Sequence, residues 1–237
     1  MNLISRPIRF TNEVDAWRRI LDALGGALLT DDHGWVVYQL GSGRLALHAA
    51  SEEDPAGSSM LCFETEQSLG DVASAASGAG APVEVRELDH GISVEVNGVF
   101  HATVDQATPG DAVASQPELS VLGIWYGADT AGARTLLEQL GLKARVVADN
   151  GAWTDFSCDG GGLMAVHSGA TPGTELGLEW NGDVEDALAL LKSAGIDAEL
   201  IDETYGRTVH IPDPDGGRSI WLSEVQTDLY GYTLSCE

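Results

Sequence analysis

Two histidines of this sequence occupy matched places and are its first candidates for chemistry. His48 ends the apolar segment GRLALH (43–48), and His167 ends the similar segment GLMAVH (162–167). A neutral imidazole accepts a proton near about pH 6.5, so each ring could act as a ligand-binding donor or general base in a cavity. Each could equally cap the end of its strand by hydrogen bonding to a backbone carbonyl.

Four further histidines and the large aromatic residues complete the set of candidates. His33 and His90 fall in turn segments, where we expect them to be solvated. His101 and His210 lie on predicted strands, and His210 can face either side. The aromatic residues on or near predicted strands are Phe10, Trp35, Tyr38, Trp125, Tyr126, Trp153, Trp180 and Trp221. They either build the core or line a cavity for an apolar or planar ligand, and in an acidic protein that ligand could be a cationic aromatic molecule.

The elements that position these residues occur twice, because the chain is an internal repeat. At an offset of 116, residues 8–26 align with 124–142, and at an offset of 115, residues 63–96 align with 178–211. The sequence therefore predicts a first domain over 1–105, a linker over 106–118 and a second domain over 119–237. The linker is rich in Pro, acidic and small residues, as an exposed connection should be. Each half is long enough to bury its own core.

Within each half the hydrophobic period changes in a fixed order. Residues 6–11 read as a strand, and the next segment places Val14, Trp17, Ile20 and Leu24 on one helical face before a Gly-Gly stop. Three short strands follow, and then the same order begins again. The second half predicts helices near 129–140 and 183–194. The chain is thus expected to hold four strand–helix–three-strand (βαβββ) units.

Four such units in two pairs resemble the vicinal oxygen chelate superfamily, which includes glyoxalase I and bleomycin-resistance proteins. The likeness is most specific in the second half, where the turn DPDGG (213–217) precedes the last predicted strand. It implies an α+β fold of two tandem domains, each with two βαβββ units that form a curled mixed sheet around a cavity. The fold alone fixes no reaction.

The resemblance also implies a divalent metal ion held by His and Glu side chains from the first and last strand of each unit. In the first half the corresponding strands offer Ser5, Arg6, His48, Met60, His101 and Thr103. In the second half they offer His167, Glu175 and, at the last strand, Ile220 or Trp221. A metal site needs three or four ligands, so we expect no cofactor. His167 and Glu175 are the weak candidates if a divalent metal binds.

The sequence therefore favours a metal-independent protein of the glyoxalase/bleomycin-resistance type that binds a small organic molecule, such as an antibiotic or another secondary metabolite. The candidate ligand-binding residues are His48, Met60, His101, His167, Glu175, Trp221, Trp35 and Trp153. One alternative is a metal-dependent lyase, dioxygenase or isomerase of the same superfamily. Another is an assembly or regulatory module with filled cavities and a basic partner.

The charge and composition of the chain exclude several classes of binding partner. The 12 Lys and Arg against 37 Asp and Glu give a formal net charge of −25, which repels nucleic acid and anionic membranes. No apolar run reaches the roughly 18 residues of a membrane span. The N-terminal residues lack the apolar core of a signal peptide, and the three cysteines form no paired pattern, so we expect a cytoplasmic protein. Its two halves could pair internally in a monomer, or the chain could form a homodimer.

Overall fold

The computed structural model describes residues 1–88, 91–203 and 206–235. Its helices lie where the sequence predicts them: α1 (Val14–Ala23), α2 (Leu69–Gly78), α3 (Thr130–Gln139) and α4 (Val184–Ser193). A side-chain oxygen of Ser68, Asp129 or Asp183 accepts a backbone hydrogen bond at the start of α2, α3 or α4, respectively. These caps satisfy amide groups that the helix itself leaves unpaired.

The strands follow the predicted βαβββ order in all four units. The first half contains β1 (Leu3–Ser5), β2 (Ile8–Thr11), β3 (Ala27–Asp32), β4 (Trp35–Gln39), β5 (Arg44–Ala49), β6 (Ser59–Met60), β7 (Cys62–Thr65), β8 (Val83–Leu88), β9 (Gly91–Asn97) and β10 (His101–Gln106). The second half contains β11 (Leu119–Gly127), β12 (Lys143–Ala148), β13 (Trp153–Ser157), β14 (Leu163–Ser168), β15 (Gly173–Trp180), β16 (Glu199–Glu203), β17 (Gly206–Ile211), β18 (Ile220–Glu224) and β19 (Tyr232–Leu234). The α+β class is therefore confirmed.

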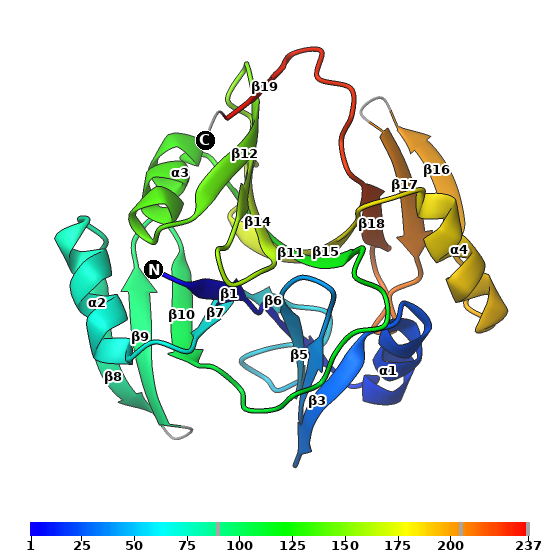
Figure 1. Ribbon diagram of the computed structural model, residues 1–237, viewed down its shortest axis with the longest axis horizontal. Helices are drawn as coiled ribbons and strands as arrows, with labels where there is room; N and C mark the ends of the chain where they lie inside the picture. Colours follow the sequence, from blue (N-terminus) through cyan, green and yellow to red (C-terminus); the bar gives the residue numbers. More distant parts are fainter. Residues whose placement is uncertain (89–90, 204–205, 236–237) are drawn as a thin grey trace.

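The sheets of each half curl into a trough (Figure 1). In the second half, nine strands form one sheet in the order β16-β17-β18-β15-β11-β14-β13-β12-β19. In the first half, the equivalent sheet is divided into β1-β7-β10-β9-β8 and β3-β4-β5-β2-β6. The helices lie outside each trough, and the two troughs open in opposite directions (Figure 1). We call their inner surfaces the first and second concave faces.

Both large hydrophobic cores contain residues from both halves. One core joins α1, β4 and β5 to α4, β15, β17 and β18. The other joins α2, β7, β9 and β10 to α3, β11, β13 and β14. The two halves therefore share their large cores, because the apolar outer surfaces of the two curled sheets pack against each other.

The opening strand of each half also hydrogen-bonds to a turn of the other half. Ser5 N donates to Gly161 O (2.9 Å), and Val121 N donates to Ser42 O (3.1 Å). A Cβ added to Gly43, which has φ of +77°, would lie 2.6 Å from Gly162 Cα. Glycine at this position therefore permits the backbones to meet at the seam.

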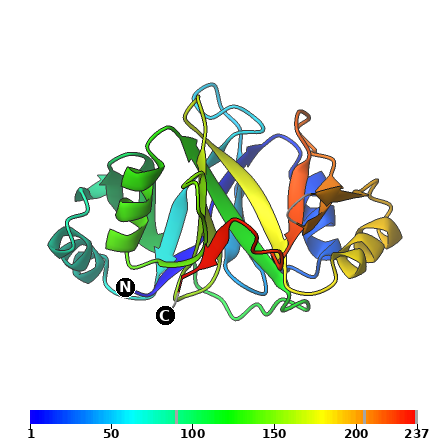
Figure 2. The same ribbon diagram turned by 90° about the horizontal axis from the view of Figure 1, so that it is seen from above.

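The segment after the last strand of each half runs across the mouth of its trough. After β18, the chain crosses to the opposite wall, where β19 pairs antiparallel with β12 (Figures 1 and 2). After β10, the linker takes the matching path, and Gly110 approaches Leu29 on β3. Rather than being a free connection, the linker docks through Thr108, whose hydroxyl donates to Glu64 (2.6 Å).

Candidate functional site

The second concave face presents a tryptophan on one of its walls. On β18, Ile220 and Leu222 point outward into the core, so Trp221 between them points inward. Register places Leu122 on β11 opposite Gly177 on β15, and Gly177 opposite Trp221. The Trp221 residue is 41% exposed. Solvent therefore reaches this wall of the trough, beside a position that has no side chain.

Trp221 is stacked on His210, its cross-strand partner on β17. The two ring centroids are 5.6 Å apart and the planes differ by 8°. His210 Nε2 is inaccessible to solvent and makes no hydrogen bond, although Glu203 Oε1 lies 3.9 Å away. The pair forms a parallel aromatic stack with the carboxylate of Glu203 near it. The sequence did not determine which face of the sheet the side chain of His210 is on. The strand register places it on the concave face.

His167 lies near the end of the opposite wall in an aromatic cluster. Its ring is 5.1 Å from that of Tyr126 and 5.7 Å from that of Trp153, and its Nδ1 is 2.7 Å from Ser168 O. The first half repeats this arrangement: the ring of His48 is 5.8 Å from Phe10 and 5.7 Å from Trp35.

The first-half cluster repeats the backbone contact as well. His48 Nδ1 is 2.9 Å from Ala49 O, the carbonyl of the following residue. Both histidines thus make the strand-end contact that their matched positions suggested. The same rings also line the ends of their troughs, so the contact leaves a ligand-binding role open.

Three charged side chains meet at another point of the second concave face. Arg145 on β12 donates two hydrogen bonds to the carboxylate of Glu179 on β15, at 3.0 and 2.9 Å. Its Nη2 also lies 3.3 Å from Asp155. Burial raises the pKa of Asp155 to about 6, even though Arg145 and a hydrogen bond from Val146 N oppose the shift. The hydrogen bonds from Arg145 to Glu179 connect β12, in the outer wall of the trough, to β15 in its floor.

Charged and polar side chains instead occupy part of the first concave face, beside the hydrophobic cluster that includes Ile8 and Phe10. Arg6, 2% exposed, contacts Glu64 and Asp105, and Arg44 also bonds Glu64. Cys62 lies among them, and burial raises the pKa of its thiol above the ordinary value. Arg6 and the other members of this group lie on or beside β1, β5, β7 and β10. Sequence reasoning missed the group, apart from placing Arg6 near a ligand position.

The remaining predicted residues are dispersed. Met60 packs in a small cluster on the first concave face. His101 is exposed where β10 begins. Glu175 lies on the second concave face, 3.4 Å from Arg218 Nη1. Exposed His33 lies in a turn, as predicted, whereas His90 is outside the described residues. The eight candidates therefore do not converge on one site.

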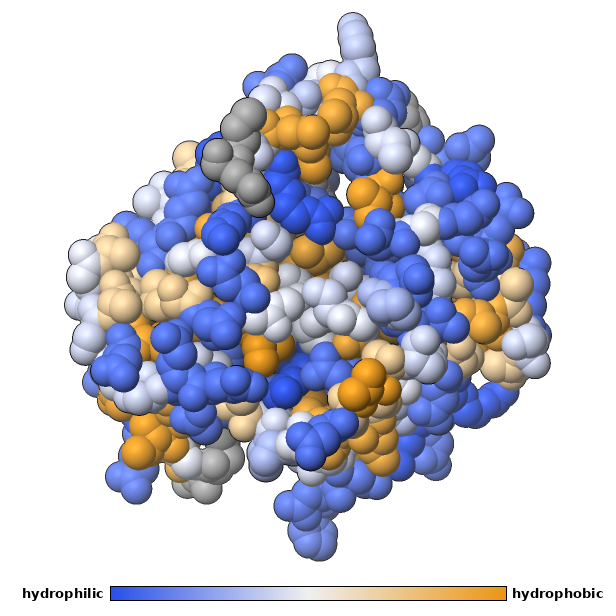
Figure 3. Space-filling view, in the orientation of Figure 1, coloured by the Kyte–Doolittle hydropathy of each residue, from blue (hydrophilic) through white to orange (hydrophobic). Residues whose placement is uncertain are grey.

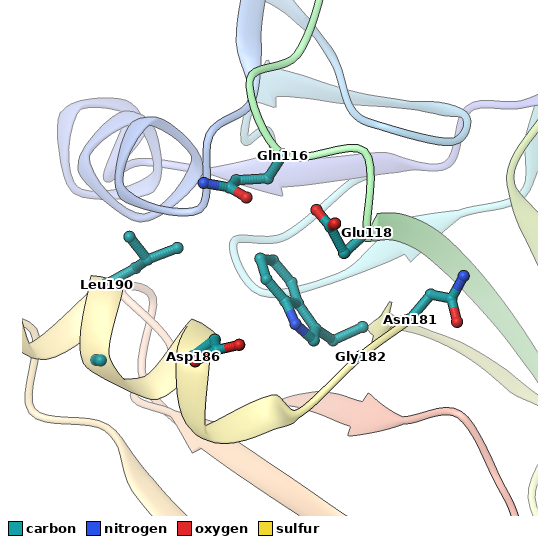
Figure 4. Close-up of a pocket in the computed structure, with 8 residues that line it drawn as sticks. Gln116, Glu118, Asn181, Gly182, Asp186 and Leu190 are labelled. Carbon is teal, nitrogen blue, oxygen red and sulfur yellow. The ribbon is translucent and has the colours of Figure 1, made fainter.

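Two recesses lie outside these groups. One, of about 430 Å³, separates the linker from α4 (Figure 4). Its lining residues are Gln116, Glu118, Trp180, Asn181, Gly182, Asp186, Ala189 and Leu190. The other, of about 290 Å³, lies where the halves meet and includes Glu175 and Arg9. Of the predicted ligand-binding residues, only Glu175 lines either of these two recesses.

The donors on the concave faces do not fit a metal ion. Across the middle of the second face, the strand row presents Leu122, Gly177 and Trp221, none of which supplies a metal-binding atom. At the equivalent depth of the first half lies the cation Arg6, which connects β1 to β2. Within residues 1–88, 91–203 and 206–235, no three His, Cys, Asp or Glu side chains gather as a metal site requires.

The surface hydropathy and the unpaired state of the described cysteines are those that the composition predicts. Hydrophilic residues predominate on the face in Figure 3, and hydrophobic residues form separate groups. Cys62 and Cys158 are buried free thiols, and Cys236 is outside the described residues. No helix in the described part of the chain is long and apolar enough to cross a membrane.

Comparison with known proteins identifies the fold. No protein-family model and no curated protein matches the sequence. Among solved structures, a catechol 2,3-dioxygenase has a TM-score of 0.61 and 17% identity, covering 94% of this chain and 92% of its own. The Mn(II)-bound glyoxalase from Novosphingobium aromaticivorans has a TM-score of 0.60 and 14% identity, covering 93% and 80%. Homoprotocatechuate 2,3-dioxygenase from Arthrobacter globiformis has a TM-score of 0.60 and 15% identity, covering 93% and 78%.

Proposed function

We propose a function from the side chains of the second concave face, because the vicinal oxygen chelate fold that the sequence indicates does not determine chemistry. We propose that the second concave face binds a small, planar organic molecule against Trp221 and His210 without using a metal ion. An antibiotic or another secondary metabolite is the ligand class. The observation that carries the proposal is the partly exposed Trp221, which lies in a cross-strand row that offers no metal donor.

Charge favours a cationic ligand over a neutral or anionic one. Glu203 lies beside His210, and Glu175 lies on the same concave face. The formal net charge of −25 adds a long-range field of the same sign. Stacking on an indole is itself stronger for a cation than for a neutral ring. The proposed ligand is therefore planar, partly apolar and positively charged.

Titration with three planar probes tests this proposal. Trp fluorescence would be followed with 1-methylquinolinium, naphthalene-2-methanol and naphthalene-2-sulfonate, which are cationic, neutral and anionic. We expect saturable quenching, tightest for the cation, and at least a tenfold loss of affinity in Trp221→Ala, about 1.4 kcal/mol. Tyr230→Ala, which removes an aromatic side chain that is 94% exposed, should bind as the unmodified protein does. No saturable change with any probe contradicts the proposal.

Metal-dependent catalysis is the competing function, because the structural neighbours include dioxygenases and a Mn(II)-bound glyoxalase. Elemental analysis of the purified protein separates the two. A stoichiometric divalent ion that is lost in His167→Ala, but kept in His33→Ala, would favour a metal-dependent lyase, dioxygenase or isomerase. Under our proposal neither variant changes the metal content.

We also propose that the protein is a monomer whose halves form an internal pseudo-dimer. The shared cores and the reciprocal hydrogen bonds between halves support this proposal, because each half already covers the outer surface of the other. Light scattering should give a mass near 24.9 kDa. A mass of twice that value would contradict it.

A further inference from the structure

Arg6 lies at the centre of the first half. It connects β1 to β2 and is 2% exposed. Its Nε is 2.8 Å from Glu64 Oε1, and its Nη2 is 2.6 Å from Asp105 Oδ2. The same Nη2 lies 2.9 Å from Cys62 Sγ. A single guanidinium thus meets side chains from β7 and β10.

The resemblance seen in the sequence implies that a divalent ion in this fold is held by side chains from the first and last strand of each βαβββ unit. Arg6 directly follows the opening strand β1, Cys62 and Glu64 lie on β7, and Asp105 lies on β10, the last strand of the half. The comparison with a Mn(II)-bound glyoxalase establishes that a protein of this fold can hold a divalent ion. In this chain, the side chain that enters from the opening strand is itself positively charged.

The surroundings of Arg6 balance its charge. Arg44 is the second cation of the group and bonds Glu64, so two positive and two negative groups share the interior. Ser93 donates to Asp105 at 2.6 Å. On the remaining side, the Trp35 ring covers the guanidinium, with its centroid 4.8 Å from Arg6 Cζ. Buried carboxylates persist only when they are paired in this way.

We infer that the guanidinium of Arg6 is a built-in cation that takes the place of a metal ion in the first half of this fold. The first half is therefore a filled, structural half whose buried carboxylates need no ion from solution. This inference concerns the first half alone and does not depend on the function proposed for the second.

Removal of the guanidinium tests the inference. Arg6→Ala leaves Glu64, Asp105 and Cys62 around a vacated position. We expect its melting temperature to fall by about 10 °C, because a buried pair loses one partner. Excess Mn²⁺ or Zn²⁺ should restore at least half of that loss and remain bound through gel filtration, as measured by elemental analysis. The same ions should leave the melting temperature of the unmodified protein unchanged.

Arg44→Ala is the matched control, because it also removes a buried cation from Glu64 but keeps Arg6. It should be destabilised without recovering on addition of metal. Equal recovery of both variants would indicate general charge compensation and overturn the inference, as would no recovery of Arg6→Ala. If Arg6→Ala does not fold without metal, refolding from denaturant with and without Mn²⁺ gives the same contrast. Failure to refold under both conditions would also overturn it.

Discussion

Asp155 makes the second concave face sensitive to pH at the scale of a single residue. Its carboxyl has a pKa raised to about 6 by burial, whereas an unfolded Asp titrates near about 3.9. Between these values the native protein binds more protons than the unfolded chain. Its contribution to the free energy of unfolding therefore falls as pH rises from about 4 to about 6, and stays low above that.

Asp155→Asn should remove this contribution, because the amide carries no charge and its oxygen can still accept from Val146 N. Relative to this variant, the unmodified protein should lose up to about 3 kcal/mol of unfolding free energy between pH 4 and pH 7, at about 1.4 kcal/mol per pKa unit. Urea unfolding of both proteins across this range measures the difference. Stability curves that run parallel would contradict the assignment.

Individual residues show which side-chain contacts could be predicted from the sequence and which could not. His48 and His167 could be found because the repeat aligns them, and both make the same contact with the next carbonyl. The Arg6 group could not be found in that way. Its bonds reach Cys62 and Asp105, which are 56 and 99 residues away, and the second half repeats only Glu64 of the group, as Glu179.

At the scale of elements, hydrophobic period predicted the helices and the βαβββ order because these depend on local alternation. It did not predict β19, whose three residues pair with β12 only after a long return across the trough. Nor could it reveal that the linker follows the matching path over the first half. Such strand ends depend on contacts between distant segments, which carry no local pattern.

The C-terminal segment after β18 offers a prediction at this scale. A chain ending at Glu224 should remain folded, because β19 adds only three residue pairs to the edge of the sheet and two of its three residues are exposed. Hydrogen exchange at the amide of Val147 or its neighbours in β12 should accelerate, and acrylamide should quench Trp221 more strongly.

The linker provides the control for that truncation. Replacing residues 107–114 with a Gly-Ser segment of equal length removes Thr108, which bonds both Glu64 and Arg44. This change should lower the melting temperature more than the truncation does. If the truncated chain unfolds instead, the segment after β18 is part of the core structure and the prediction is wrong.

At the scale of the whole molecule, the two halves depend on each other where their turns meet. Gly43→Ala would force a methyl group to within 2.6 Å of Gly162 Cα and 2.7 Å of Val121 Cγ1. Overpacking of this kind costs about 1–3 kcal/mol beyond the strain of a left-handed residue. We expect a single, cooperative unfolding transition at a lower denaturant concentration.

Gly151→Ala is the matched control for this seam. Gly151 has φ of +71°, close to the +77° of Gly43, but nothing lies within 4 Å of an added Cβ. It should therefore show only the backbone strain, about 1–2 kcal/mol. Equal destabilisation of the two variants would mean that close contact between the halves contributes nothing measurable.

Covalent joining of the two halves has a consequence for how they can differ. In an assembly of identical subunits, every substitution alters each copy at once. An arginine that fills the interior of one subunit would therefore fill the interior of the others as well. In a single polypeptide, the two halves have separate sequences and can change independently. Here Arg6 can fill the interior of the first half and make that half rigid. The second half carries the exposed side chain of Trp221 at the corresponding depth and is free to change its chemistry.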